Sequence, residues 1–399
     1  AMHRLAPRAG GILLPRCHNP VDCGILPFPY SRPMILQPGR LRRRLSLPLA
    51  ALPWALALPL DAQAVQDLPP VMPRLPCTLN SFADVSLAEA PAQVTSVQTE
   101  DINGKAMCLV QGVISPQIRF IVRLPVAGWT QRYLQTGCGG LCGRLAIHSP
   151  QRDCAFERDG TLAMASTDMG HTSGAGGIWA AADMQLRVDF GYRAVHATRL
   201  IAGELVHRYY GQPPKYTYFS GCSDGGREAL MAVQRYPKDF DGVVAGNPGF
   251  RLSRAAIAQS WDNQQFLKAA PVNEQGERIF ANALTPKDLD AVAAGVLERC
   301  DALDGLKDGL VNAWERCDFK PRMVEKDIGK EKVALLEAVF GGARTSKGEP
   351  LYASWPWDAG INSGNWRGWK LGDSQTPTPN ARNIVLGAMS LPHYFMTPY

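Results

Sequence analysis

The stretch YFSGCSDGGREAL, residues 218–230, places a serine where the sequence pattern changes from strand to helix. The preceding residues, 215–220, alternate aromatic, β-branched and polar side chains, which is typical of a short strand. The following residues, 227–236, are rich in helix-forming side chains and end before a proline. Ser223 is therefore expected in a tight turn that joins a strand to a helix.

The turn matches a catalytic pattern. Gly221, Ser223 and Gly225 fit G-x-S-x-G, the nucleophile elbow of α/β hydrolases, in which small neighbours let the backbone pass close to a strained serine. Such an elbow exposes the hydroxyl near the positive end of the following helix, which stabilises negative charge on a reacting oxygen. A Gly/Ser-rich surface turn is the alternative, and the flanking strand and helix disfavour it.

A serine that attacks an acyl group needs backbone donors for the resulting oxyanion. One donor is the N–H of the residue after the nucleophile, here Asp224. The other is expected in a glycine-rich loop after an early strand, and residues 137–140 (GCGG) follow the predicted strand 131–136. We assign Gly139 and Asp224 as the oxyanion donors, with a plain tight turn as the alternative for the loop.

The wider pattern alternates strands and helices, which predicts a mostly parallel sheet covered on both faces. Residues 251–399 lack this alternation, because they are helical at first and then rich in Trp, Gly, Pro and polar residues. We therefore predict an α/β-hydrolase fold with a catalytic core over residues 65–250 and a large inserted lid over residues 251–399. The predicted strands are 117–125, 131–136, 161–166, 215–220 and 241–245, and the predicted helices are 189–210 and 227–236.

The N-terminus has the pattern of an export signal. Residues 40–44 (RLRRR) are basic, residues 45–60 are apolar, and residues 62–64 (AQA) have the small-x-small form of a cleavage site. We predict a signal peptide over residues 34–64, and residues 1–33 have no assigned role. A stable membrane anchor is not expected, because three prolines interrupt a stretch shorter than the about 20 apolar residues that a span needs. The protein is therefore expected to be secreted or periplasmic.

Charge and cysteine usage bear on two kinds of function, nucleic-acid binding and zinc binding. The formal net charge of +6 is raised by the N-terminal arginines, and no basic stripe interleaved with aromatics follows them, so nucleic-acid binding is not indicated. Export permits disulfides, and no CxxC pair with zinc-finger spacing occurs, which favours bridges over a zinc site. Beyond residue 64 the cysteines are Cys77, Cys108, Cys138, Cys142, Cys154, Cys222, Cys300 and Cys317.

The stretch CDALDGLKDGL, residues 300–310, gathers three aspartates around a glycine. Asp301, Asp304 and Asp308 would repel one another unless a cation held them, and hard oxygen donors in a short loop suit calcium. The spacing is not that of an EF-hand, and a solvated acidic turn is the alternative. Cys300 and Cys317 bracket the loop and could be bridged, which would staple it.

The partners of a catalytic serine are not evident. In α/β hydrolases the acid and the histidine follow the serine, and only His393 does so here. His196 and His207 lie on one predicted helix and are expected to be packing or surface residues, whereas His171 lies in a glycine-rich loop and could line a pocket. We assign none of them as general base. The histidines are His3, His18, His148, His171, His196, His207 and His393.

From about Cys77 onward, the chain resembles the tannase/feruloyl esterase family. The elbow at 221–230 (GCSDGGREAL) and the acidic loop at 300–309 (CDALDGLKDG) carry the resemblance. Residues 165–171 (ASTDMGH), 189–196 (DFGYRAVH) and 365–369 (NWRGW) support it. The resemblance implies an α/β-hydrolase fold with a large calcium-binding lid and a serine nucleophile at Ser223.

The resemblance also implies roles for further residues. The calcium ligands would be the carboxylates of Asp301, Asp304 and Asp308 with the carbonyls of Leu306 and Leu310. Disulfides would join Cys77 with Cys108 and Cys300 with Cys317. Cys222 would pair with a cysteine that follows the triad histidine, but no cysteine follows Cys317. The triad Asp and His, that cysteine, the end of the lid and the last core strands are therefore expected to be missing through C-terminal truncation.

The expected function is that of a secreted serine carboxylic-ester hydrolase with an acyl-enzyme on Ser223. Its substrate would be a small aromatic ester of the feruloyl, galloyl or terephthaloyl type. One alternative is a truncated, non-catalytic remnant that lacks the triad Asp and His. A peptidase of the same fold is a more distant alternative.

Overall fold

The structure, a computed structural model, describes residues 68–147 and 160–396. The predicted signal peptide at 34–64, the upstream segment 1–33 and Cys154 lie outside the described residues. Among the helices that the structure describes, none is both long and apolar enough to cross a membrane.

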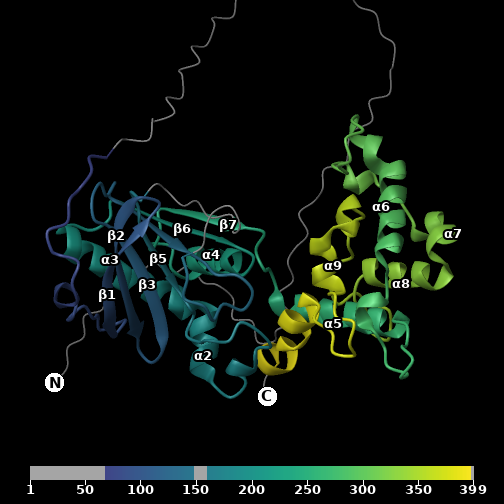
Figure 1. Cartoon of the computed structure of the whole chain (residues 1–399), viewed down its shortest axis with the longest axis horizontal. Coiled ribbons are helices and arrows are strands. Elements are labelled where there is room, and N and C mark those ends of the chain that lie inside the picture. The colour runs from purple at the N-terminus through teal and green to yellow at the C-terminus, as the bar shows by residue number, and fades with distance from the viewer. Residues whose placement is uncertain (1–67, 148–159, 397–399) are drawn as a thin grey trace, which may run out of the picture. The chain divides into compact units, whose positions relative to one another are not determined.

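A seven-stranded sheet with the order β1-β2-β3-β5-β4-β6-β7 forms the first part of the chain (Figure 1). The pairs β5–β4, β4–β6 and β6–β7 are parallel, whereas β1–β2, β2–β3 and β3–β5 are antiparallel. The prediction of a mostly parallel sheet is therefore wrong, because the sheet is evenly mixed. The strands are β1 Ala92–Ile102, β2 Lys105–Ile114, β3 Ile118–Pro125, β4 Arg132–Thr136, β5 Ala163–Thr167, β6 Tyr216–Cys222 and β7 Gly242–Gly246.

The antiparallel part includes a hairpin that the strand predictions omitted. Strands β1 and β2 are joined by Asn103 and Gly104, both with positive φ (53° and 78°). An Asn-Gly pair readily adopts this conformation, whose twist matches that of the two strands. The Asn-Gly pair is the sequence signal that would have predicted the hairpin.

The parallel strands place alternate side chains on opposite faces of the sheet. Tyr133 and Phe219 belong to the main hydrophobic core, whereas Leu134 and Met164 form a smaller cluster with Tyr218. Helices α3 (Ala194–Tyr210) and α4 (Asp224–Arg235) pack on the sheet and contact each other, so they lie on one face. The predicted covering of both faces by helices is not found in the part of the chain that the structure describes.

A continuous helical run leads into α3. It begins with α2 (Met184–Val188), continues through a π-helical turn, η3 (Asp189–Arg193), and ends at Gly211 with φ 74°. The predicted helix 189–210 thus starts five residues late. The Asp183 carboxylate caps the start by accepting a hydrogen bond from the Leu186 amide at 3.0 Å.

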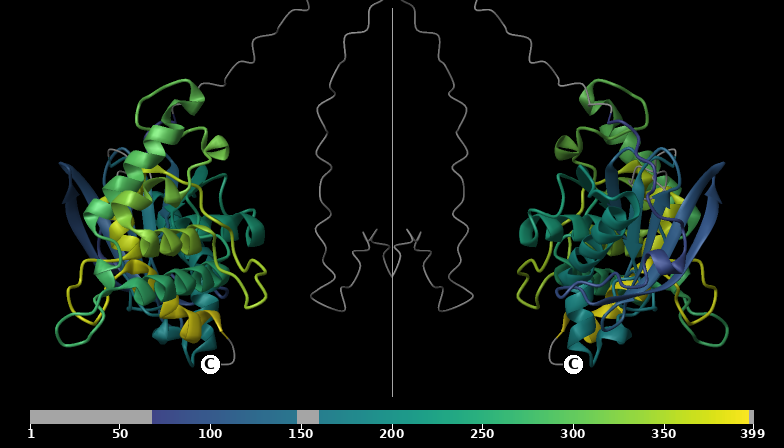
Figure 2. Two further views of the ribbon diagram at one scale, coloured as in Figure 1. Left: turned by 90° about the vertical axis from the view of Figure 1, so that its right-hand side faces the viewer. Right: turned by 90° about the vertical axis from the view of Figure 1, so that its left-hand side faces the viewer.

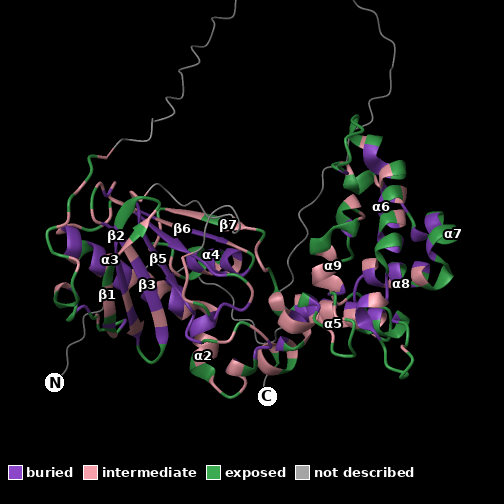
Figure 3. Ribbon diagram, in the orientation of Figure 1, coloured by how far each residue is buried: buried purple, intermediate pink, exposed green. Residues whose placement is uncertain are grey.

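Beyond β7 the chain is helical (Figure 2). We call residues 252–396 the helical region. A second hydrophobic cluster, which includes Phe266, Leu289, Phe319 and Leu336, packs its helices together, and Figure 3 shows their buried faces. The helices are α5 Leu252–Ala269, α6 Pro286–Cys300, α7 Glu325–Ile328, α8 Lys330–Phe340 and α9 Gly364–Lys370. Short helical turns elsewhere are η1 Leu79–Ser81, η2 Ile178–Ala180, η4 Phe280–Asn282, η5 Asp301–Asp304, η6 Trp314–Arg316, η7 Pro321–Val324, η8 Ala359–Asn362, η9 Asn383–Ala388 and η10 Leu391–Phe395.

The end of the helical region returns to the loops beside the sheet. The amide of Gly176 donates to the carbonyl of Val385 at 3.0 Å. The guanidinium of Arg187 donates to the carbonyls of His393 and Tyr394 at 2.6 and 2.7 Å. Turns η9 and η10 are therefore held against the segment that precedes α3.

Candidate active site

Ser223 lies between the last residue of β6 and the first residue of α4. Its backbone has φ 63° and ψ −114°, and its side chain is exposed. A non-glycine residue with positive φ is strained and persists only where the surroundings fix it. The strand and the helix predicted around Ser223 are both present, and the turn between them presents the hydroxyl to solvent.

Two glycines permit this turn. A Cβ atom on Gly221 would lie 2.5 Å from the carbonyl carbon of Gly225, and one on Gly225 would lie 3.1 Å from the carbonyl oxygen of Cys138. The backbones of β6, of α4 and of the loop that contains Cys138 thus approach too closely for larger side chains. The serine is anchored as well, because its amide donates to Gly246 at 3.0 Å and its carbonyl accepts from Gly249 at 2.8 Å.

Residues 137–143, called the glycine-rich loop below, run beside the elbow. The amide of Gly137 donates to Ser220 at 2.9 Å, and the amide of Gly225 donates to Cys138 at 2.7 Å. The proposed donors are Gly139, which follows Cys138, and Asp224, which precedes Gly225. Within residues 68–147 and 160–396, neither of these two N–H groups donates to another protein group. A Cβ atom on Gly139 would meet nothing within 4 Å, so its peptide borders open space.

Asp224 and Arg227 form a buried ion pair in the first turn of α4. The Nε atom of Arg227 lies 2.7 Å from one Asp224 oxygen, and Nη2 lies 3.0 Å from the other. The same guanidinium donates to the carbonyls of Phe190 and Gly191 at 3.0 and 3.1 Å. Burial alone would lower the pKa of Arg227, but the Asp224 carboxylate, together with Glu228 and Tyr394, raises that pKa above its usual value. The pair ties α4 to η3.

A buried glutamate, which the sequence interpretation did not single out, completes this cluster. Oε1 of Glu228 accepts a hydrogen bond from the amide of Cys138 at 3.2 Å. Burial, and then the charge of Asp224, raise the pKa of Glu228 well above its usual range. A glutamate on the buried side of a helix next to a nucleophile is the signal that could have drawn attention to it.

The structure contains three disulfides among the described residues. Cys77 is bonded to Cys108, and Cys300 to Cys317, which are the pairings implied by the family resemblance. The third, Cys138–Cys142, closes the glycine-rich loop and was not assigned from the sequence. None of the three includes Cys222.

No histidine of the described part of the chain is hydrogen-bonded to Ser223. His171 is buried, and burial lowers its pKa to about 4. His196 is held by an aspartate at 2.7 Å, and that hydrogen bond raises its pKa. His207 lies at the surface, and the backbone of His393 is held by Arg187. The general base is therefore not identified by contact.

The aspartates of the acidic loop organise its backbone. One oxygen of the buried Asp301 accepts from the amides of Asp308 and Gly309 at 3.2 and 3.0 Å. Asp304 accepts from Leu306 at 3.0 Å. Asp308 accepts from Leu310 at 3.1 Å. Carboxylate and carbonyl oxygens are donors that suit calcium. In the described part, however, these carboxylates are not gathered within 4.8 Å of one another.

A cavity of about 520 Å³ lies in the helical region and not at the elbow. Its lining includes Trp355, Trp366, Trp369 and Lys370, and it includes no residue of the elbow or of the glycine-rich loop. The site around Ser223 is therefore defined by its backbone geometry and not by this cavity.

Comparisons with known proteins show the family of the chain. The family model for tannase and feruloyl esterase matches residues 102–391. The chain is 32% identical to mono(2-hydroxyethyl) terephthalate hydrolase of Piscinibacter sakaiensis, over 67% of this chain and 50% of that protein. It is 31% identical to probable feruloyl esterase B-2 of Aspergillus flavus, over 56% of this chain and 42% of that protein. The chain thus spans about half the length of these relatives.

Solved structures show the same fold. The crystal structure of feruloyl esterase B from Aspergillus oryzae matches 75% of this chain and 62% of its own, with a TM-score of 0.58 and 24% identity. The mixed sheet with helices is of the α/β-hydrolase type. The match of the family model over most of the chain shows that this chain belongs to the tannase and feruloyl esterase family.

Proposed function

We propose that the chain is a carboxylic-ester hydrolase whose nucleophile is Ser223. The observation that carries the proposal is an exposed serine at φ 63° between a strand and a helix, beside the glycine-rich loop. The relatives are named as esterases and hydrolases of feruloyl and terephthalate esters, which supports a small aromatic ester as the substrate.

The reaction would pass through an acyl-enzyme. The Ser223 hydroxyl attacks the ester carbonyl, its proton passes to a base, and the alkoxide leaves as an alcohol. The N–H groups of Gly139 and Asp224 hold the oxyanion, and water then hydrolyses the acyl-enzyme. We assign the nucleophile and the oxyanion donors but no general base, because no histidine of the described residues is hydrogen-bonded to Ser223.

The test is hydrolysis of methyl ferulate, methyl gallate and mono(2-hydroxyethyl) terephthalate by the chain and by Ser223→Ala. Loss of the nucleophile should lower kcat at least about 10³-fold. Equal rates in the two proteins would remove Ser223 from the mechanism.

A second candidate is a non-catalytic member of the family, because no histidine of the described residues is hydrogen-bonded to Ser223. Its prediction is that the chain hydrolyses none of the three esters faster than Ser223→Ala does. Esters of amino acids and chromogenic peptides, assayed in parallel, test the more distant peptidase alternative.

We also propose that the acidic loop binds calcium through Asp301, Asp304 and Asp308, with the carbonyls of Leu306 and Leu310. The Cys300–Cys317 disulfide encloses the loop and supports the proposal. Bound calcium should raise the melting temperature, because a ligand of the folded state stabilises it. The melting temperature is measured with about 1 to 5 mM calcium and, separately, with chelator at about the same concentration. Asp301→Asn should abolish the difference between the two melting temperatures. Equal midpoints in the original chain would refute the site.

We propose finally that the protein is exported, with the helical region acting as a lid over the site. Three disulfides in the described part are typical of an oxidising compartment. N-terminal sequencing of the protein expressed from the full reading frame tests export, and an N-terminus that retains residues 34–64 would contradict it.

A further inference from the structure

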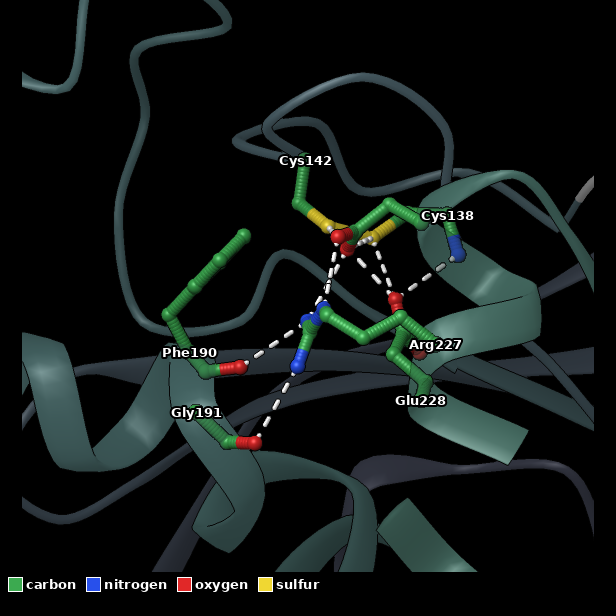
Figure 4. Close-up of polar contacts among 7 residues, drawn as sticks. Cys138, Cys142, Phe190, Gly191, Arg227 and Glu228 are labelled. Atoms are coloured by element: carbon green, nitrogen blue, oxygen red, sulfur yellow. Dashed lines mark hydrogen bonds and ion pairs between the residues drawn. A yellow bond between two sulfur atoms is a disulfide. The ribbon is translucent and has the colours of Figure 1, made fainter. Parts of the chain in front are cut away.

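Glu228 is a buried acid for which the proposed reaction has no use. It lies in α4, five residues after Ser223, and is 1% exposed. The charged and polar groups that face it are Asp224 and Arg227 on its own helix and the Cys138–Cys142 bridge on the glycine-rich loop. Figure 4 shows Arg227 and the bridge beside Glu228. Burying a carboxyl group costs folding free energy unless the group is hydrogen-bonded.

Two hydrogen bonds hold Cys138 of the glycine-rich loop to helix α4. The amide of Cys138 donates to Glu228 at 3.2 Å, and the carbonyl of Cys138 accepts from Gly225 at 2.7 Å. Helix α4 therefore holds both sides of the residue that precedes Gly139. The Cys138 carbonyl and the Gly139 N–H belong to one planar peptide, so the bond from Gly225 sets the direction of that N–H, while the bond to Glu228 holds the peptide before it.

The disulfide adds a third tie. Cys138–Cys142 closes the loop, and Oε1 of Glu228 lies 2.8 Å from the sulfur of Cys138. On the other side of the bridge, a carboxylate oxygen of Asp224 lies 3.2 Å from the sulfur of Cys142. The bridge therefore packs against the carboxyl groups of Asp224 and Glu228 in the first turns of α4.

A metal ion is the rival explanation for this cluster. Cys138, Cys142, Asp224 and Glu228 offer ligand atoms that all lie within 4.8 Å of one another. The two sulfurs are joined to each other, however, and thiolates are what a soft metal would need. Asp224 is already paired with Arg227. The cluster is built to hold the loop and not an ion.

The charge state of Glu228 suits this task. Burial and the charge of Asp224 favour its neutral form, which donates to Asp224 and accepts from the amide of Cys138. Glutamine reproduces both the shape and the hydrogen bonds of a neutral glutamic acid. Aspartate is one methylene too short to reach Cys138, and leucine cannot accept a hydrogen bond.

We propose that Glu228 is a positioning residue that holds the glycine-rich loop so that the N–H of Gly139 faces the carbonyl attacked by Ser223. This inference rests on the proposed function, because Gly139 is an oxyanion donor only if Ser223 is the nucleophile.

The test compares Glu228→Gln, Glu228→Asp and Glu228→Leu, with Gln234→Leu as the matched control at an exposed position of the same helix. Hydrogen exchange of residues 137–143, followed by mass spectrometry, reports the tie without any need for turnover. The Asp and Leu variants should exchange at least about 10-fold faster in this segment, whereas Gln and the control should match the original chain.

Turnover of methyl ferulate gives the second readout. In the Asp and Leu variants kcat should fall about 10- to 100-fold, with KM changed less than about threefold, because a misplaced oxyanion donor acts on the transition state. The Gln variant should retain kcat. If Leu fails to fold, the comparison of Asp with Gln carries the test.

Unchanged exchange and unchanged kcat in the Asp and Leu variants would overturn the proposal. So would a Gln variant as impaired as Leu, because a carboxamide keeps both hydrogen bonds. Failure of the proposed function is distinguishable: Ser223→Ala would then match the original chain in hydrolysis, while the exchange of residues 137–143 would still respond to Glu228.

Discussion

At the scale of single residues, the sequence predicts Ser223 well and its support poorly. A local pattern of glycines around a serine specifies a strained turn, because only small residues permit the close approach of β6 and α4. Glu228 acts on Cys138, a residue 90 positions away in the sequence. No local pattern encodes such a contact, so it was missed. The Cys138–Cys142 bridge spans four residues, and its pairing was left open.

The neutral state of Glu228 predicts a pH-dependent stability. The folded protein keeps a proton on Glu228 that the unfolded chain loses above its ordinary pKa of about 4.3. The stabilisation by this proton is complete below that pH and declines as the pH rises towards the raised pKa. Glu228→Gln removes the decline, so its gain in the free energy of unfolding over the original chain should be larger at pH 7.5 than at pH 4.

Urea unfolding at the two pH values measures this difference. Glu331→Gln, at an exposed position of α8, is the matched control and should show no such gain. Parallel pH profiles of Glu228→Gln and the original chain would show that Glu228 is ionised in the fold.

At the scale of elements, the sequence predicts which strands are present better than it predicts how they pair. Each of the five predicted strands is present within two residues of its expected ends, since apolar alternation is a local property. The evenly mixed sheet was not predicted, because strand direction depends on the Asn103-Gly104 hairpin and on long-range pairing of β3 with β5. The cysteines on either side of the acidic loop are bridged, as the family resemblance implied. The hydrogen bonds within the loop were not predicted.

The crossing of β6 and α4 makes Gly221 irreplaceable. A Cβ atom there would lie 2.5 Å from backbone atoms of Gly225, which cannot move without displacing α4. Gly221→Ala should therefore lower the free energy of unfolding by about 2–4 kcal/mol and slow ester hydrolysis further than the loss of folded protein explains. Gly368→Ala, in α9 with open space around it, should instead stabilise the protein by up to about 1 kcal/mol. Denaturant unfolding measures both, and equal effects would contradict the steric argument.

At the scale of the whole molecule, the described sheet ends at strand β7. In the described residues β7 pairs only with β6, and its Val244 side chain is 55% exposed. On the adjoining α4, Val233 is 47% exposed. An unpaired strand edge flanked by exposed apolar side chains favours pairing with another chain.

This edge predicts self-association of the chain as given by the sequence. Sedimentation velocity between about 1 and 100 μM should show species larger than a monomer, in proportion to concentration. Val244→Lys places a charge on the edge and should restore the monomer, because a charged side chain opposes the addition of a further strand. Val272→Lys, at an equally exposed valine (59%) outside the named strands, is the matched control and should leave the association unchanged. A monomer at every concentration, or equal effects of the two lysines, would show that β7 does not mediate contacts between chains.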